Sequence, residues 1–385
     1  KPGIRFKGFT DDWEQRKLGE LGSLKNGMNF SKKAMGIGFP FVNLQNIFGN
    51  NVIDVSNLGK AMASDSQLKD YNLLNGDVLF VRSSVKLEGV GEAALVPQTL
   101  DNTTYSGFII RFRDEYGLDN NFKRFVFGIE SVRNQIMSQA TNSANKNISQ
   151  SVLENLELAI PSKSEQQKIG AYFSNLDHLI TLHQRKYDKL VMSKKSMLEK
   201  MFPKNGQTKP EIRFSGFIDD WEQRKLGELG TITTGNTPST SIPDYYSDDG
   251  IVWVTPTDIC ENITFESARK LSDLGQQVGR VVPKNTILVT CIASIGKNTM
   301  LGNTGSFNQQ INGLTPNENK YDPYFLLTES ALWSAKMKGS AAAGTMQIVN
   351  RTEFSELKTW LPSLIEQQAI GAFFKQLDHL ITLHQ

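Results

Sequence analysis

The sequence predicts an α+β fold in which two similar globular domains are separated by long helices that pack as an antiparallel coiled coil. Three features of the 385-residue chain support this prediction. An apolar stripe with helical spacing runs from Glu165 to about Met201, and its first half recurs at Glu366–Gln385. The opening segment Lys1–Gly22 recurs at Lys209–Gly230 with three differences, which makes the two halves near-duplicates at their borders.

The middle parts of the two halves share an outline but differ in most residues. Each middle predicts a compact domain of about 160 residues with many short strands. The expected elements are strands in 75–84 and 284–294, helical segments over Asn121–Gln139 and Pro323–Met337, and tight turns at Asp249-Gly250 and Asn312-Gly313. Identical borders around divergent middles indicate that one docking surface is presented twice beside two different target-reading surfaces.

The long helix is the element around which the halves are arranged. Neither Gly nor Pro occurs from Ala171 to Phe202, and Ser162 or Ser164 can cap its start. At 1.5 Å per residue it would span roughly 55 Å. The predicted divisions are 1–162 and 209–363 for the domains, 163–208 for the central helix with its linker, and 364–385 for the second helix.

The ends of the chain suggest that the natural protein is longer. The chain starts at Lys1 without a methionine. The second helix stops at Gln385, whereas the first continues beyond the corresponding residue, Gln184, for about five more turns. We therefore expect both ends of the natural protein to be missing from this sequence.

Composition excludes several classes of protein. Hydrophobic residues make up 39% and charged residues 21%, as in ordinary globular proteins. No apolar run approaches the roughly 18 residues of a membrane span, and no charged-then-apolar leader is present. Cys260 and Cys291 are too few for a disulfide framework or a zinc site, although a single disulfide between them is compatible with the sequence. The cytoplasm is the expected location.

Charge is unevenly distributed, although the net charge is only +2. Seven Lys and Arg residues lie from Arg185 to Lys204, against Asp188 and Glu199. This run fits either a solvated helix face or a surface that attracts phosphates or an acidic partner.

The sequence lacks the motifs of an enzyme. All four histidines, His178, His183, His379 and His384, lie in the repeated helix and are five residues apart within each copy. Metal-binding pairs on a helix are four residues apart, so a structural or interface role is expected. No phosphate-binding loop, methyltransferase tetrad or cofactor-binding glycine loop is present, and the nuclease-like Glu356-Leu357-Lys358 is common by chance. The chain is predicted to be a reader or a scaffold.

A DNA reader needs amide and basic side chains for base edges, and Lys, Arg, Ser and Thr for phosphates. Both middles carry such residues in loops, at matching places along the two halves. Each one alone is more often simply solvated, but together they indicate recognition. The candidate DNA-binding residues are Arg82, Ser83, Ser84, Lys86 and Lys146 in the first half, and Thr290, Ser294, Lys297, Asn298, Gln309 and Gln310 in the second.

The chain resembles the specificity subunit of a type I restriction–modification system over essentially all of its length. The resemblance rests on the border text IRFKGFTDDWEQRKLGELG and IRFSGFIDDWEQRKLGELG, on the helix text EQQKIGAYFSNLDHLITLHQRK, and on the phrases TGNTPST, WVTPTDI and SFNQQIN. It implies two target-recognition domains that each read one half of a split, asymmetric site in double-stranded DNA, with the helices holding them apart.

The resemblance also implies partners. Two modification subunits, which carry S-adenosylmethionine and methylate adenine, would dock on the repeated surfaces, and restriction subunits with motor and nuclease activity would join for cleavage. This chain would bind no cofactor or metal and catalyse nothing. The candidate docking residues are Phe173, Leu176, Ile180, Phe374, Leu377 and Ile381. The alternative is a duplicated scaffold, or a decoy that binds modification subunits without reading DNA.

Overall fold

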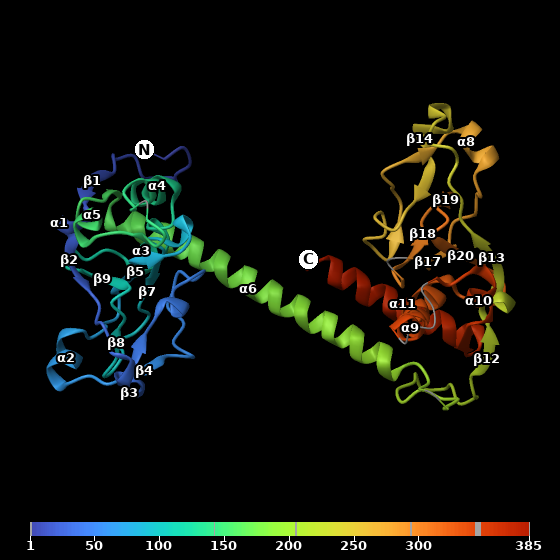
Figure 1. Ribbon diagram of the computed structural model, residues 1–385, viewed down its shortest axis with the longest axis horizontal. Helices are drawn as coiled ribbons and strands as arrows, with labels where there is room; N and C mark the ends of the chain where they lie inside the picture. The colour runs from blue at the N-terminus through green and yellow to red at the C-terminus, as the bar shows by residue number, and fades with distance from the viewer. Residues whose placement is uncertain (1, 142, 205, 293–294, 343–347, 385) are drawn as a thin grey trace. The chain divides into compact units, whose positions relative to one another are not determined.

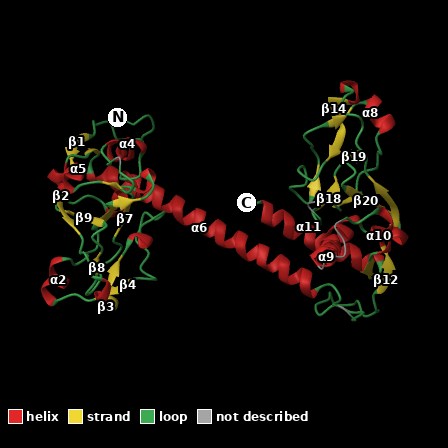
Figure 2. Ribbon diagram, viewed as in Figure 1, coloured by secondary structure: helices red, strands yellow, loops and turns green. Residues whose placement is uncertain are grey.

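The computed structural model describes residues 2–141, 143–204, 206–292, 295–342 and 348–384, which form two compact units (Figure 1). The first unit ends at Thr181 and the second begins at Leu182, within the long helix α6 (Lys163–Lys200). Both units mix short strands with helices (Figure 2). The predicted α+β class with two similar domains and a long helix between them in the chain is confirmed.

The first unit contains many short strands. They are β1 (Glu14–Lys17), β2 (Gly22–Asn26), β3 (Met35–Val42), β4 (Gly59–Ala61), β5 (Val78–Val81), β6 (Ser83–Ser84), β7 (Ala93–Leu95), β8 (Thr104–Tyr105), β9 (Ile109–Asp114), β10 (Lys146–Asn147) and β11 (Glu157–Ile160). The helices before α6 are α1 (Leu18–Leu21), α2 (Asp65–Asp70), α3 (Asn120–Val126), α4 (Glu130–Ser138) and α5 (Gln150–Glu154).

The second unit contains a similar set of strands and helices. Its strands are β12 (Glu222–Lys225), β13 (Gly230–Thr234), β14 (Tyr246–Val254), β15 (Ile263–Thr264), β16 (Lys270–Leu271), β17 (Ile287–Thr290), β18 (Asn298–Leu301), β19 (Gly305–Phe307), β20 (Ile311–Pro316) and β21 (Lys358–Leu361). Its helices after α6 are α7 (Leu226–Leu229), α8 (Asp273–Val278), α9 (Pro323–Ala342), α10 (Arg351–Glu356) and α11 (Leu364–Thr382).

The sheets of the two units have the same topology. The order β2-β9-β5-β7 in the first unit matches β13-β20-β17-β18 in the second, where β15 adds a fifth strand. The order β4-β3-β8 likewise matches β16-β14-β19, and the pair β1-β11 matches β12-β21. The divergent middle parts of the two halves therefore share one sheet topology, which forms a common frame.

The repeated border residues tie each frame to its helix. Arg5 donates to both carboxylate oxygens of Glu165 at 2.6 and 2.8 Å, and Arg213 donates to Glu366 at 2.7 Å twice. Both carboxylates are buried, and the hydrogen bonds from Arg5 hold the pKa of Glu165 below its usual value. These repeated residues therefore serve folding within each unit rather than an exposed surface.

Two repeated glycines let each helix approach the rest of its unit. A Cβ on Gly170 would lie 2.6 Å from the backbone nitrogen of Phe122, and one on Gly371 would lie 2.4 Å from Oδ1 of Asp322. Phe122 lies in the first turn of α3, and Asp322 immediately precedes α9. The repeated glycines are therefore explained by close packing between helices.

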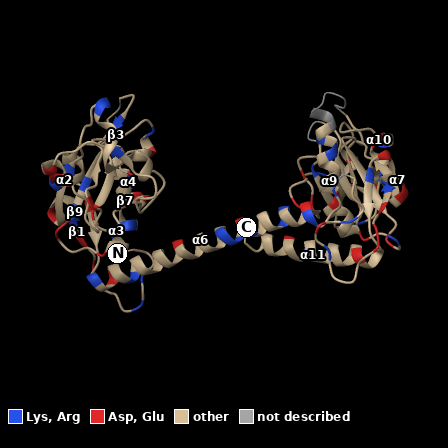
Figure 3. Ribbon diagram, turned by 90° about the horizontal axis from the view of Figure 1, so that it is seen from below, with Lys and Arg blue, Asp and Glu red and all other residues tan. Residues whose placement is uncertain are grey.

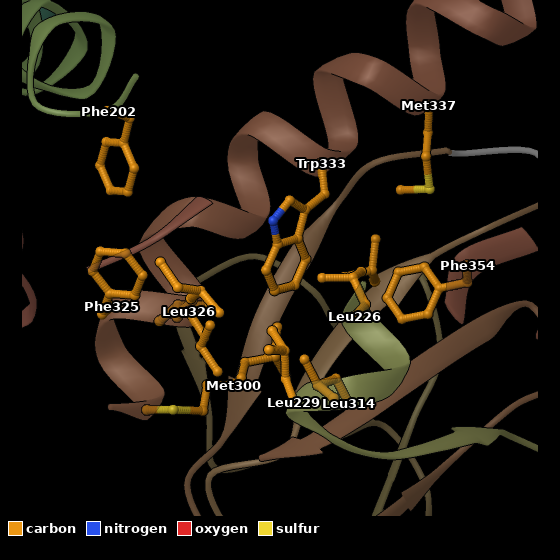
Figure 4. Packing of buried hydrophobic residues seen from close by; sticks show 14 of the residues in the cluster. Phe202, Leu226, Leu229, Met300, Leu314, Phe325, Leu326, Trp333, Met337 and Phe354 are labelled. Carbon is orange, nitrogen blue, oxygen red and sulfur yellow. The ribbon is translucent and has the colours of Figure 1, made fainter. Parts of the chain in front are cut away.

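A large apolar core holds the second unit together (Figure 4). Trp333 and Met337 of α9 point toward Leu226 and Phe354, and all four side chains are buried. Phe202, just beyond the end of α6, packs against Phe325 and Phe374 with ring centroids 5.5 and 6.1 Å apart. The end of α6 is thereby fastened to α9 and α11.

The C-terminal part of α6 and α11 run antiparallel within the second unit. Along α6 and just past its end, His183, Lys194 and Phe202 contact residues of decreasing number: His384, Asp378 and Phe374. The sequence-based bounds of both helices differ from the observed ones by a few residues.

Some local predictions were wrong. The segment Asn121–Gln139 forms two helices, α3 and α4, that are separated by Phe127–Ile129, because Gly128 interrupts the helical run. Asn312-Gly313 lies inside β20, where Asn312 pairs with Thr234, and Asp249-Gly250 lies inside β14 at an irregularity of the ladder. Pairing with distant strands overrides the local preference of these dipeptides for turns.

Candidate nucleic-acid interface

Two loops of the first unit meet in a small ladder. β6 and β10 pair antiparallel, with Lys146 opposite Ser84 and Asn147 opposite Ser83. Ser83, Ser84 and Lys146 are partly exposed. The structure thus brings together three of the five candidate residues of this half, which come from loops far apart in the sequence.

The other two candidates flank this ladder. The backbone N–H of Lys86 donates to Oγ of Ser84 at 3.2 Å, and its side chain is exposed. Arg82 is half-buried, and its guanidinium makes a long contact of 3.4 Å with the carbonyl oxygen of Gly107. Lys86 is therefore well placed to contact a ligand directly, whereas Arg82 also supports the neighbouring loop.

A groove of about 520 Å³ lies beside the ladder. It is lined by Leu44, Phe48, Ser83, Ser84, Val85, Lys86, Glu88, Gly89, Glu92, Phe108 and Asn145. Phe48, Val85 and Phe108 were not predicted as site residues, because recognition of bases and phosphates favours amide and basic side chains. No local signal marks Phe108, since the sequence does not show that its ring is exposed.

The second unit uses several of its candidates internally. Thr290 is fully buried, and its hydroxyl oxygen accepts a hydrogen bond from the backbone N–H of Lys297 at 2.9 Å. The side chain of Asn298 donates to Ser330 of α9 at 2.9 Å and accepts from Ser334. Thr290 and Asn298 therefore hold a turn and a helix in place, and their direct contact with DNA stays a prediction.

The remaining candidates of this half are more accessible. Lys297 is exposed, and its Nζ donates to the carbonyl oxygen of Pro256 at 3.0 Å. Gln309 is exposed and accepts from the hydroxyl of Thr237, while Gln310 is half-buried and accepts from Nδ2 of Asn308 at 3.0 Å. Ser294 lies outside the described residues.

Equivalent backbone hydrogen bonds align the two candidate surfaces residue by residue. The N–H of Arg82 donates to the carbonyl oxygen of Phe108 at 2.7 Å, as that of Cys291 does to Gln310 at 2.8 Å. The carbonyl oxygen of Arg82 accepts from Ile148 at 3.0 Å, as that of Cys291 does from Val349 at 3.1 Å. Phe108 and Gln310 therefore occupy the same backbone position in the two units.

The candidate docking residues divide into two groups. Phe173, Leu176 and Ile180 on α6 are exposed, with 43%, 36% and 67% of their surface accessible. Phe374 and Leu377 on α11 are buried in the second unit, and Ile381 is half-buried. Phe374 and Leu377 therefore stabilise this unit and do not present a free surface.

Figure 3 shows Lys and Arg residues of α6 in blue, and ion pairs within the second unit partly neutralise the basic run Arg185–Lys204. Lys194 contacts Asp378 at 2.6 Å, and Lys200 and Lys204 contact Glu211 at 3.1 and 3.2 Å. For these lysines the structure favours ion pairs with neighbouring carboxylates over a free surface that binds phosphate.

The two cysteines do not form a disulfide: Cys260 is exposed and free, and Cys291 is buried and free.

The repeated acidic residue next to the first histidine of each copy fastens the helix to its unit. Asp177 accepts hydrogen bonds from Asn51 and Arg124 at 3.0 Å each, and Asp378 accepts from Tyr324 at 2.9 Å. His183 and His384 contact each other through Nδ1 at 2.9 Å. These contacts support the structural or interface role predicted for the second histidine of each copy.

The described part of the chain contains no group of three or more His, Cys, Asp or Glu side chains that could hold a metal ion. None of its helices combines the length and apolar composition needed to cross a membrane.

A family model described as the type I restriction modification DNA specificity domain matches residues 10–192 and 218–385. A Methanocaldococcus jannaschii protein assigned as the specificity subunit of type I restriction enzyme MjaX is 23% identical over 391 residues, covering 97% of this chain and 89% of the relative. The HindI specificity subunit of Haemophilus influenzae is 28% identical over 171 residues, 42% of this chain and 37% of that relative.

Solved structures show the same fold. The S subunit of a type I restriction–modification system from M. genitalium has a TM-score of 0.61 at 15% identity, over 98% of this chain and 93% of that one. The HsdS subunit from Thermoanaerobacter tengcongensis has a TM-score of 0.51 at 17% identity, over 97% of this chain and 90% of that one.

Proposed function

Because this chain belongs to the type I restriction–modification DNA specificity family, we propose that its two units each read one half of a bipartite, asymmetric site in double-stranded DNA. Affinity would come from phosphate contacts, and sequence selectivity from side chains that reach base edges in the major groove. The distance between the half-sites would be set by the length of the helix.

One observation carries this proposal. The two units share sheet topology and equivalent backbone hydrogen bonds around the candidate surfaces, yet the side chains presented there differ, as at Phe108 and Gln310. A common frame with different exposed side chains suits two readers of different sequences. A pair of identical docking domains would have no need for this divergence.

We further propose that this chain recognises DNA without catalysing a reaction. Two modification subunits would dock on the repeated surfaces, with the exposed apolar side chains Phe173, Leu176 and Ile180 of α6 among the contacts. Those subunits would supply S-adenosylmethionine, extrude the target adenine and methylate it. Restriction subunits would join this cytoplasmic complex for cleavage.

The test uses the chain assembled with its modification subunits. Methylome sequencing of cells that carry the complex identifies the bipartite motif, and methylation is then assayed on DNA that varies in one half-site at a time. Arg82→Ala should change recognition of one half-site and leave the other unchanged. Lys297→Ala removes a positive charge from the candidate surface of the second unit and should affect the opposite half-site.

The salt dependence of DNA affinity distinguishes the proposed DNA-reading function from the scaffold alternative. A reader loses affinity steeply between 50 and 200 mM salt while it keeps its sequence preference. Equal loss on all sequences for Arg82→Ala would make this residue a phosphate contact or a structural residue. If the complex with the native chain shows no sequence-selective binding to DNA, the scaffold or decoy alternative is supported instead.

A further inference from the structure

The groove of the first unit is lined by exposed apolar side chains next to polar residues. The accessible fractions are 57% for Phe108, 78% for Val85 and 38% for Phe48. All three line the groove together with Ser83, Ser84 and the amide of Asn145. Exposed apolar side chains that gather in a concave site favour a ligand with an apolar group of its own.

The backbone of Phe108 is hydrogen-bonded on both sides at this site. Its carbonyl oxygen accepts from the N–H of Arg82 at 2.7 Å, and its own N–H donates to Oγ of Ser106 at 3.3 Å. The neighbouring Ile109 is fully buried, which anchors the chain next to the exposed ring. The ring therefore projects from a hydrogen-bonded backbone next to a buried residue.

The equivalent residue of the second unit has the opposite chemistry. Gln310 occupies the same backbone position as Phe108, and it offers an amide group where Phe108 offers a ring. An amide can form paired hydrogen bonds with adenine, whereas a phenyl ring contacts the 5-methyl group of thymine. The two side chains thus fit two different features of the major groove.

The charges around the groove orient such a ligand. Lys86 is exposed and lines the groove, as do Glu88 and Glu92. The carboxylate of Glu92 accepts a hydrogen bond from the N–H of Gly49 at 2.9 Å. Carboxylates repel phosphate but can accept from the exocyclic amine of cytosine. A base edge therefore suits the groove better than the sugar–phosphate backbone does.

We propose that Phe108 is a specificity-determining residue that contacts the 5-methyl group of a thymine in the half-site read by the first unit. This inference rests on the proposed DNA-reading function and adds the chemical group that is read. Burial of one methyl group predicts a loss of roughly fivefold in affinity when it is removed.

The experiment replaces thymine by deoxyuridine, which removes only the 5-methyl group. The complex with modification subunits is titrated by band shift against duplexes that carry deoxyuridine at one position at a time. The complex with the native chain should bind about fivefold more weakly when deoxyuridine replaces thymine at one position of the first half-site. Phe108→Ala should bind deoxyuridine and thymine equally well at that position.

Matched variants test whether the effect belongs to this side chain. Phe265 is similarly exposed, at 53%, but lies in the second unit, so Phe265→Ala should leave the response to deoxyuridine in the first half-site unchanged. Phe108→Gln introduces the side chain of the second unit and should alter the base preferred at the same position.

Several outcomes would overturn the inference. One is sequence-selective binding that no deoxyuridine in the first half-site weakens, and another is a first half-site without an A·T pair. Weaker copurification of Phe108→Ala with the modification subunits, with an unchanged DNA motif, would show that the groove holds a protein segment instead. DNA binding without sequence preference by the complex with the native chain would overturn the proposed function itself.

Discussion

His183 and His384 occupy the same position in the two copies of the repeated helix, and their Nδ1 atoms lie 2.9 Å apart in the second unit. The offset between them, 384 − 183 = 201, equals that between the helix starts, 366 − 165 = 201. Equivalent residues of two antiparallel segments meet where those segments are related by a local twofold axis. This contact therefore fixes the register of α6 against α11.

Acid should weaken this contact. Desolvation, together with the positive charges of Lys186 and His183, lowers the pKa of His384 from its ordinary value of 6.5. The neutral form is favoured in the folded state, so the stabilisation is present above pH 6.5 and is lost as pH falls through the lowered pKa. Ring-proton NMR should show His384 titrating at higher pH in His183→Gln, and an unchanged midpoint would contradict this expectation.

Removal of a repeated arginine should destabilise its unit strongly. Arg213→Ala leaves the buried carboxylate of Glu366 without its partner, which we expect to cost about 3 kcal/mol. Tryptophan fluorescence during urea unfolding reports this unit, because four of the five tryptophans lie in it. The control is Arg224→Ala, which removes an exposed pair with Glu222 and should cost far less. Similar losses for both variants would rule out the buried pair as the source of stability.

The stability of the second unit should fall as pH rises toward 8. Burial raises the pKa of Glu329 to about 8, while the hydroxyl of Thr359 and the N–H of Trp360 donate to its Oε1. The stabilisation is complete below the ordinary pKa of 4.5 and is lost as pH rises through about 8, because the folded state holds a proton that the unfolded state releases.

Glu329→Gln keeps the shape of this side chain and removes its titration. The stability of the variant relative to the native chain should therefore increase from pH 4.5 to about 8 and stay constant above. Urea unfolding followed by tryptophan fluorescence at several pH values measures the difference. A difference that does not change with pH would show that Glu329 titrates as in the unfolded chain.

Alanine at a repeated helix glycine should destabilise the chain despite its higher helix propensity. A Cβ at Gly371 would lie 2.4 Å from Asp322 and 3.0 Å from the backbone nitrogen of Phe325, so we expect a loss of about 1–3 kcal/mol. Gly339 in α9 has no atom within 4 Å of such a Cβ, and Gly339→Ala should stabilise by up to about 1 kcal/mol. Thermal unfolding compares the two variants, and stabilisation by both would contradict the packing explanation.

The sequence was sufficient for features that depend on repetition and local periodicity. The duplicated borders and the long apolar stripe predicted two similar α+β units and a helix between them. The tightly buried residues Glu165 and Glu366 could not be recognised, because the same text also fits an exposed docking surface. Their partners, Arg5 and Arg213, are distant in sequence, and only folding reveals the pairs.

The tertiary structure decided which side chains are available for recognition. Thr290 and Asn298 have suitable chemistry but are used to hold a turn and a helix, whereas Phe108 lacked a sequence signal and is exposed in a groove. Likewise, the apolar spacing of α11 did not show that Phe374 faces the core of its own unit. Periodicity determines which residues share a face of an element, but long-range pairing determines what that face contacts.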